Sequence, residues 1–310
     1  MTDFFTEINI KNAIIANNSV VLKNWSVVKQ SIVNEVAYKK YKKIKFLLKY
    51  IFPTLNFSSK KDYILITDEW SKNYCHWLWE ALTKLLILQK NHPQATLVLP
   101  KSYLKIDFVK NSLEVFGIYP KDLIFINKKS HLKVVNLNFI PCINIATLGY
   151  YDFLEFSLLR DRIISHFENE LKLDFGEKIY ISRSDPKKNT VRKVANEAEL
   201  EMLLVKYGFK TVYMENYSFL EQISIANKAK IIISPHGAGI TNTMFMSENG
   251  ILFELVNKEW SKTCFAEMVE RMNIKYLRQD CEAINQKETI HLVDIIVDIK
   301  KLEENLMKLI

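Results

Sequence analysis

The chain has 310 residues, of which 48% are hydrophobic and 25% charged. This composition excludes a disordered protein, and no stretch approaches the roughly 20 uninterrupted apolar residues that span a bilayer. The net charge of +8 predicts attraction to an acidic partner, and nucleic acid, anionic lipid and sugar phosphates all qualify.

The N-terminus lacks the basic and apolar regions of a secretory signal. The four cysteines form no CxxC pair and match no histidine cluster, so they indicate neither zinc nor a disulfide framework. Both observations predict a cytoplasmic location.

Residues 1 to about 35 are typical of short strands and turns, and a basic segment over 37–52 follows them. Its lysines interleave with aromatic and aliphatic residues, and Pro53 ends it. Two interpretations stay open. The segment can lie on an anionic membrane face, or it can be the solvated, lysine-rich face of a surface helix.

The next stretch predicts a strand over 63–67 and a mostly apolar helix over 73–89. His76 and Glu80 lie one helical turn apart on a narrow polar stripe, with tryptophans on either side. A solvated stripe explains this spacing. Alternatively, the two side chains share a hydrogen bond, and aromatic surroundings raise the pKa of the carboxyl as a general base requires.

Strands over 96–99, 123–126 and 134–140 and a helix over 103–116 continue the alternation of strand and helix. This order predicts a parallel or largely parallel sheet. An amphipathic helix over 152–173 is predicted to connect two domains.

A second alternating block begins with a strand that ends in Arg183 and a loop that contains Arg192. Ser218 and Glu221 have the spacing of a capping box. The predicted elements are strands over 178–183, 211–214, 231–233 and 251–255, and helices over 196–207, 219–228 and 291–309.

The stretch from Ile231 to Asn242 is the main candidate binding site. A buried strand ends at Ser234-Pro235, and His236, Gly237 and Gly239 follow, before an apolar segment that can open a helix. Small residues and the first N–H groups of a helix form an anion site, so we expect a phosphate or diphosphate here. A tight turn with a hydrogen-bonded core histidine is the competing interpretation.

The strand–helix order of the second half predicts a doubly wound sheet, in which ligands bind beyond the carboxyl ends of strands. Arg183, His236 and Glu254 all lie at or near such ends. One cation, one anion-binding turn and one carboxylate suited to ribose are what a nucleoside diphosphate requires.

In order along the chain, these motifs resemble glycosyltransferase family 61, and the resemblance covers about 74–255. The motifs are Cys75-His-Trp-Leu-Trp-Glu80, Ile179-Tyr-Ile-Ser-Arg183, Arg192 with Asn196-Glu197, Gly208-Phe209, Glu221-Gln222, Pro235-His-Gly-Ala-Gly-Ile-Thr-Asn242 and Phe253-Glu254. The resemblance implies an α/β, GT-B-like fold, with two Rossmann-like domains facing across a cleft. It also implies inverting transfer from a nucleotide sugar, without cofactor or obligatory metal, and no Asp-x-Asp motif is present.

We expect an acceptor-side domain over 1–165, a nucleotide-sugar-binding domain over 166–290 and a C-terminal helix over 291–310 that packs back. Glu80, oriented by His76, is the candidate catalytic base, with His76 itself as the alternative. The expected nucleotide-sugar-binding residues are Arg183, Arg192, His236, Gly237, Ala238, Gly239, Thr241, Asn242 and Glu254. Glu254 is assigned to the ribose hydroxyls.

The expected partners are a nucleotide-sugar donor and a glycan or lipid-linked glycan acceptor of surface polysaccharide or lipo-oligosaccharide synthesis. Peripheral contact with the inner membrane is a further expectation. Two other functions stay open, a sugar-nucleotide epimerase of similar fold and a basic protein that binds anionic lipid or nucleic acid. No RNP-like or zinc-finger signature supports nucleic acid.

Overall fold

The computed structural model describes residues 6–16, 18–49, 55–127, 130–141, 153–185, 191–261, 264–285, 289–290 and 292–309. The chain divides into two compact units, Met1–Ile163 and Ile164–Ile310. Each is described by itself.

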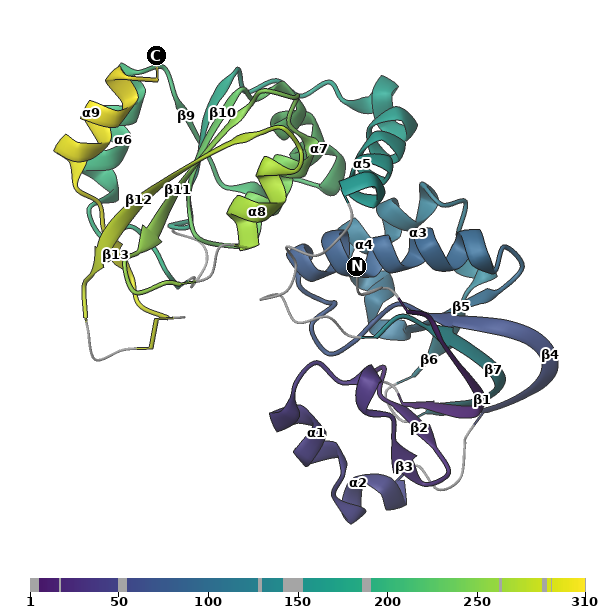
Figure 1. The fold of residues 1–310 in the computed structure, drawn as a ribbon. Helices are drawn as coiled ribbons and strands as arrows, with labels where there is room; N and C mark the ends of the chain where they lie inside the picture. Colours follow the sequence, from purple (N-terminus) through teal and green to yellow (C-terminus); the bar gives the residue numbers. More distant parts are fainter. Residues whose placement is uncertain are drawn as a thin grey trace. The chain divides into compact units, whose positions relative to one another are not determined.

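The second unit is built on a six-stranded sheet in the order β13-β12-β11-β10-β8-β9 (Figure 1). Strands β8 to β12 are parallel, and only β13 is antiparallel to its neighbour. The strands are β8 (Lys178–Ile181), β9 (Lys210–Val212), β10 (Ile231–Pro235), β11 (Ile251–Asn257), β12 (Lys275–Ala283) and β13 (Ile295–Ile296). Numbered along the chain, the five parallel strands have the doubly wound order 2-1-3-4-5, which places the topological switch point between β8 and β10.

The second unit also contains the helices α6 (Glu197–Lys206), α7 (Phe219–Lys228), α8 (Cys264–Glu270) and α9 (Ile299–Met307). The predicted capping box of α7 is confirmed, because Ser218 accepts from the Glu221 N–H and the Glu221 carboxylate accepts from the Ser218 N–H. Helices α6 and α9 pack side by side (Figure 1), and their buried leucines join the apolar strand residues in one core.

The predicted helix over 291–309 is wrong in its first half. Helix α9 begins only after its N-cap Asp298, and Ile295 lies in strand β13. Val293, Ile295 and Val297 are all buried, whereas Leu292 is 55% exposed. Alternate burial with a period of two is the pattern of a strand, so β-branched residues decided the structure here.

The first unit has a seven-stranded sheet in the order β3-β2-β1-β7-β4-β5-β6. These strands are β1 (Ile8–Ala16), β2 (Val21–Lys23), β3 (Ser26–Val27), β4 (Leu55–Leu65), β5 (Thr96–Pro100), β6 (Ile124–Ile126) and β7 (His131–Phe139). Strands β4 to β7 are parallel, but β1, β2 and β3 join by antiparallel pairing. The sheet is therefore mixed, and a Rossmann-like description fits only its β4–β5–β6 part, where α3 (Leu82–Asn91) and α4 (Asp107–Glu114) separate the strands.

The long strand β4 curves strongly in Figure 1, and its pairing with β7 shifts register between Phe57 and Asp62. The hydroxyls of Ser19, which follows β1, and Thr67, which follows β4, lie 2.6 Å apart. β1 and β4 both pair with β7, and the two residues follow opposite ends of this part of the sheet, so the curvature brings those ends together.

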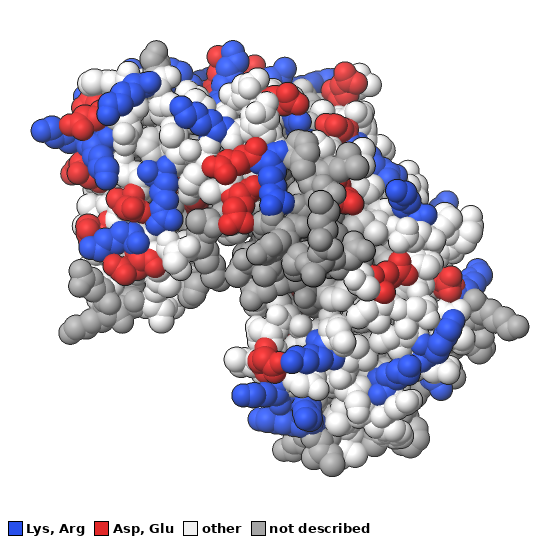
Figure 2. Space-filling view, in the orientation of Figure 1, with Lys and Arg blue, Asp and Glu red and all other residues white. Residues whose placement is uncertain are grey.

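The basic segment folds into α1 (Glu35–Tyr41) and α2 (Ile44–Lys49). Tyr41 is buried, and Tyr38, Phe46 and Leu47 pack against the same small core, which includes Ala16 and Val20. These aromatic side chains pack inside the protein, so they are not available to insert into a membrane surface. Lysine side chains lie over α1 on the surface (Figure 2), as in the alternative of a solvated, lysine-rich face. Residues 50–52 of the predicted segment lie outside the described residues.

Helix α5 (Phe153–Phe167) occupies most of the predicted connector and includes the boundary between the units. Across the described residues, no helix combines the length and apolar character that crossing a membrane requires.

Candidate active site

The turn after β10 differs from the prediction, because Ser234 and Pro235 still belong to the strand that they were expected to stop. Pro235 pairs with Leu255 as the last residue of the strand, and the His236 N–H donates to the Leu255 carbonyl at 3.0 Å. A 3₁₀ helix then runs over Ala238–Phe245, so the apolar residues expected to open a helix instead end one. Its first internal hydrogen bond runs from the Ile240 N–H to the Gly237 carbonyl, which leaves the N–H groups of Ala238 and Gly239 for a ligand.

Arg183 lies directly against Gly237. A Cβ atom added to the glycine would stand 1.9 Å from the Arg183 Nη1 atom and 2.9 Å from its Cζ atom. The Arg183 Nε group donates to the Val191 carbonyl at 3.1 Å, which anchors the side chain. Gly237 has φ 173°, an extended conformation open to any residue. The glycine is therefore needed for the close approach of a guanidinium and not for its backbone freedom.

His236 is held by a carboxylate and by aromatic rings. Its Nδ1 atom lies 2.5 Å from Glu254 Oε1, and the Tyr276 hydroxyl donates to Glu254 Oε2 at 2.6 Å. The imidazole centroid lies 4.2 Å from the Trp260 ring and 5.2 Å from the Phe265 ring. With Nδ1 engaged and the side chain 12% exposed, Nε2 is the atom that can meet a ligand.

Glu254 is therefore placed differently from the expectation that it binds ribose. It is 3% exposed, and both its carboxylate oxygens already have side-chain partners. Its geometry fits a residue that fixes the tautomer and orientation of His236. Tyr276, the second partner of this carboxylate, is a residue that sequence analysis missed, together with its whole strand β12.

Arg192 is the second cation near this turn. It adopts a φ of 60°, its Nε atom is buried without a hydrogen-bond partner, and its Cζ atom lies 5.8 Å from the Trp260 ring. Burial, and then the positive charge of Arg183, lower the pKa of Arg192 to about 10. Arg192, His236 and Trp260 line a small pocket of about 10 Å³, roughly the space of one water molecule. Burial and mutual repulsion disfavour the charged forms of Arg183 and Arg192. A bound anion would stabilise both charges.

Thr241 and Asn242, both expected to contact the nucleotide, are wholly buried. The Asn242 amide donates to Gln222 Oε1 at 3.1 Å and to the Gly239 carbonyl at 3.2 Å. It therefore supports the turn from inside, because its amide N–H groups are already used within the protein. The Thr241 hydroxyl is buried without a hydrogen-bond partner.

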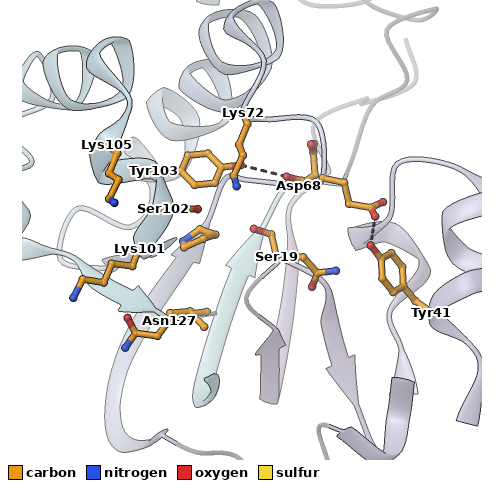
Figure 3. A pocket seen from close by; sticks show the side chains of 13 residues that line it. Ser19, Tyr41, Asp68, Lys72, Lys101, Ser102, Tyr103, Lys105 and Asn127 are labelled. Carbon is orange, nitrogen blue, oxygen red and sulfur yellow. Dashed lines mark hydrogen bonds between the residues drawn. The ribbon is translucent and has the colours of Figure 1, made fainter. Parts of the chain in front are cut away.

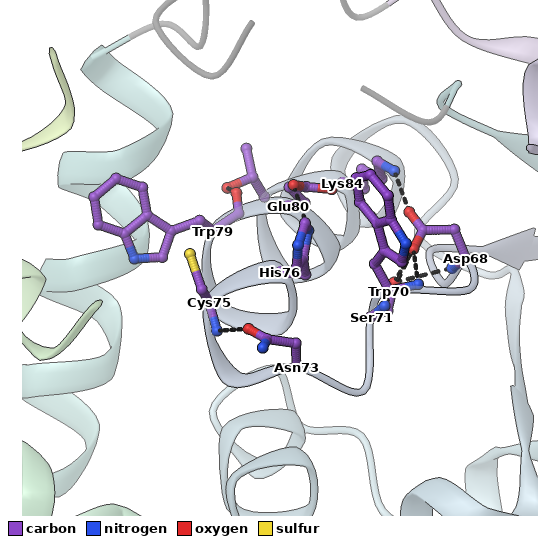
Figure 4. A network of polar contacts seen from close by, with 10 residues as sticks. Asp68, Trp70, Ser71, Asn73, Cys75, His76, Trp79, Glu80 and Lys84 are labelled. Atoms are coloured by element: carbon purple, nitrogen blue, oxygen red, sulfur yellow. Dashed lines mark hydrogen bonds and ion pairs between the residues drawn. The ribbon is translucent and has the colours of Figure 1, made fainter. Parts of the chain in front are cut away.

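In the first unit, His76 and Glu80 lie on a π-helical turn, His76–Ala81, that precedes α3. The His76 Nδ1 and Glu80 Oε1 atoms are 2.8 Å apart (Figure 4), so the predicted pair exists. The two residues are 8% and 1% exposed, which excludes the solvated stripe. π-Helical turns of this kind occur frequently at functional sites.

Burial raises the pKa of Glu80, and the hydrogen bond from His76 lowers it in part. The Trp70 ring lies 5.1 Å from the imidazole, and Glu80 Oε2 has no hydrogen-bond partner. Lys84, one turn further on, is also buried, and its Nζ atom lies 3.6 Å from the Asp68 carboxylate. A buried carboxylate with one free oxygen and a raised pKa has the properties of a general base.

Within the described part of the chain, no three His, Cys, Asp or Glu side chains gather as a metal site requires. Glu197 accepts hydrogen bonds from the Tyr180 and Ser182 hydroxyls, which makes it a structural support of β8.

Residues 74–252 match the family model described as Glycosyltransferase 61. The match covers more than half of the chain and includes both the His76–Glu80 pair and the turn at His236. The chain belongs to this family.

Curated relatives match a shorter part. An EGF domain-specific O-linked N-acetylglucosamine transferase of Drosophila melanogaster is 32% identical over 100 residues, 31% of this chain and 18% of that protein. The proteins of the same name from Xenopus laevis and Gallus gallus are 33% and 30% identical over 91 and 96 residues. The matched part spans 28% of this chain and 17% of each of these two relatives, less than a fifth of their length.

Proposed function

We propose that this chain is an inverting glycosyltransferase that moves a sugar from a nucleotide-sugar donor to a hydroxyl of a glycan acceptor. The observation that carries the proposal is the position of the Arg183 guanidinium over Gly237 beside His236. These groups lie at the carboxyl ends of β8 and β10, the switch point of the sheet, where doubly wound proteins bind ligands.

The donor diphosphate is assigned to the N–H groups of Ala238 and Gly239, the Nε2 atom of His236 and the guanidinium groups of Arg183 and Arg192. As the bond to the sugar breaks, negative charge develops on the departing diphosphate. Preorganised donors of this kind are typically worth about 3–4 kcal/mol each in the transition state. We propose that these groups neutralise the leaving group without a metal ion.

Glu80 is assigned as the base that removes the proton from the acceptor hydroxyl, and His76 as the residue that orients it. Inversion requires the base and the leaving group on opposite faces of the sugar. The proposal therefore includes a GT-B arrangement, in which the two units face each other across a cleft. Its support is family membership and the separation of the two residue sets into two units.

The donor sugar and acceptor are open to direct trial. The relatives' name makes nucleotide-activated N-acetylglucosamine the first donor to test. Surface polysaccharide or lipo-oligosaccharide remains our proposed acceptor class. We place the enzyme in the cytoplasm, with peripheral membrane contact through the exposed lysines of α1 and not through its buried aromatic residues. An epimerase would turn over the donor with no acceptor present, and a basic binding protein would bind liposomes or DNA in a salt-dependent way without affinity for nucleoside diphosphates.

The experiment that tests the proposal is calorimetric titration with UDP, GDP and CMP, in the wild type and in His236→Ala. We expect one nucleotide to bind, and His236→Ala to weaken it by about tenfold or more, because a hydrogen bond to a charged group contributes about 1.5–3 kcal/mol. His166→Ala, an exposed histidine of the same unit, is the matched control and should leave affinity unchanged. Equal affinity of wild type and His236→Ala would refute the assignment.

A further inference from the structure

A second pocket opens in the first unit (Figure 3). Its volume is about 790 Å³, within the roughly 300–1,000 Å³ of typical ligand sites. It lies where β4, β5 and β6 end and where the β1–β2 turn meets them. The residues that line it include Ser19, Asp68, Lys72, Lys101, Lys105 and Asn127.

The pocket is basic. Lys72, Lys101 and Lys105 are exposed on its rim, and none of them forms an ion pair with another described residue. The carboxylate of Asp68 is already compensated inside the protein, because it accepts from Ser71 and lies 3.6 Å from the buried Lys84. The remaining acid, Glu69, accepts a hydrogen bond from Tyr41. Three unpaired cations against one uncompensated carboxylate favour an anionic ligand.

The pocket also offers neutral polar groups. The Oδ1 atom of Asn18 is buried without a hydrogen-bond partner among the described residues, which leaves it able to accept from a ligand hydroxyl. Ser102 and Asn127 are exposed at the same rim, and the Lys72 amine lies 5.8 Å from the centroid of the Tyr103 ring, which is itself buried. A ligand with several hydroxyls matches a rim that offers amide and hydroxyl groups.

One loop joins this pocket to the His76–Glu80 pair. Residues 67–72 follow β4, and Asp68, Glu69 and Lys72 line the pocket. From the same loop, the Trp70 ring packs on His76, and the Asp68 carboxylate contacts Lys84, one helical turn beyond Glu80. A ligand in the pocket therefore contacts the loop that supports the candidate base.

We infer that this pocket binds an acidic sugar, one that carries a carboxylate or a phosphate group, as part of the acceptor. The lysines meet the anionic group, and Asn18, Ser102 and Asn127 meet the hydroxyls. The assignment to the acceptor rests on the proposed function, whereas the binding of an acidic sugar by the first unit does not.

The test is calorimetric titration of the full chain with glucuronate, glucose 6-phosphate and glucose, with no nucleotide sugar present. We expect one of the acidic sugars to bind at least about tenfold more tightly than glucose, and to bind more weakly as salt rises, because exposed charges are screened. Which of the two binds shows whether the anionic group is a carboxylate or a phosphate. The double variant Lys101→Met, Lys105→Met should lose about tenfold in this affinity.

Lys110→Met, an exposed lysine of the same unit outside the pocket, should bind like the wild type. Arg183→Met should also bind like the wild type, which shows that the sugar does not occupy the diphosphate site. Glucose bound as tightly as both acidic sugars, or unchanged affinity in the double lysine variant, would overturn the inference. Failure of nucleotide binding would instead overturn the proposed function and leave this result standing.

Discussion

Gly237→Ala is the perturbation that most directly tests the geometry of the diphosphate turn. The new Cβ atom would stand 1.9 Å from Arg183 Nη1. To reach an ordinary contact distance of about 3.5 Å, the guanidinium has to move by roughly 1.5 Å. That shift is enough to break a hydrogen bond between the arginine and a phosphate oxygen.

The expected cost is that of one charge-assisted hydrogen bond, about 1.5–3 kcal/mol, or roughly 10- to 150-fold in nucleoside diphosphate affinity. The fold should survive, because the backbone at Gly237 is extended and the obstacle is the end of a flexible side chain. At such a position, the replacement changes stability by about 1 kcal/mol or less, a few degrees in melting temperature.

The assay is calorimetry on four proteins: wild type, Gly237→Ala, Arg183→Met and the double variant. If alanine acts by displacing the arginine, its effect disappears once the arginine is gone, so the double variant should bind no more weakly than Arg183→Met. Additive losses in this cycle, or wild-type affinity in Gly237→Ala, would show that Arg183 does not bind the diphosphate from its position over the glycine.

Two further changes test the base and the support of the histidine. Glu80→Gln should abolish transfer while nucleoside diphosphate binding persists, and loss of both together would argue against a base. Because burial raises the pKa of Glu80, the native protein keeps this proton where the unfolded chain has released it, so wild-type stability falls as pH rises through that window. Thermal melts should therefore show a flatter pH dependence for Glu80→Gln. Tyr276→Phe removes the donor to Glu254 Oε2 and should lower the free energy of unfolding by about 1–3 kcal/mol. It should also weaken nucleotide binding, but less than His236→Ala does. Wild-type stability together with wild-type affinity would show that Tyr276 does not support the site.

Local patterns predicted much of the second unit. The strand before His236 and the cap of α7 depend on neighbours within a few residues, so their sequence signals were complete. The His76–Glu80 pair was visible for the same reason, since one helical turn separates its members. The spacing could not decide whether the two side chains are exposed or buried, and the structure shows that both are buried.

Long-range contacts account for what sequence analysis missed. Strand β12 was overlooked because Gln279, a polar residue, is among its buried positions and obscures the alternation. Tyr276 was missed for the same reason, because its hydrogen bond to Glu254 forms only when β12 pairs with β11. The mixed sheet of the first unit depends on β1 pairing with β7, more than a hundred residues away, and no local signal encodes that pairing.

The stretch between β12 and α9 determines how Arg192 is presented. The N–H of residue 193 donates to the Asp294 side chain, and Val194 forms a β-bridge with Ile295. The Asn196 side-chain amide donates to the Val297 carbonyl and accepts from the Val297 N–H. All three attachments lie just after the arginine, yet their partners fall beyond the family match, which stops at residue 252. In a chimaera joined at that position, the diphosphate turn would come from one parent protein. The residues that hold the backbone next to Arg192 would come from the other.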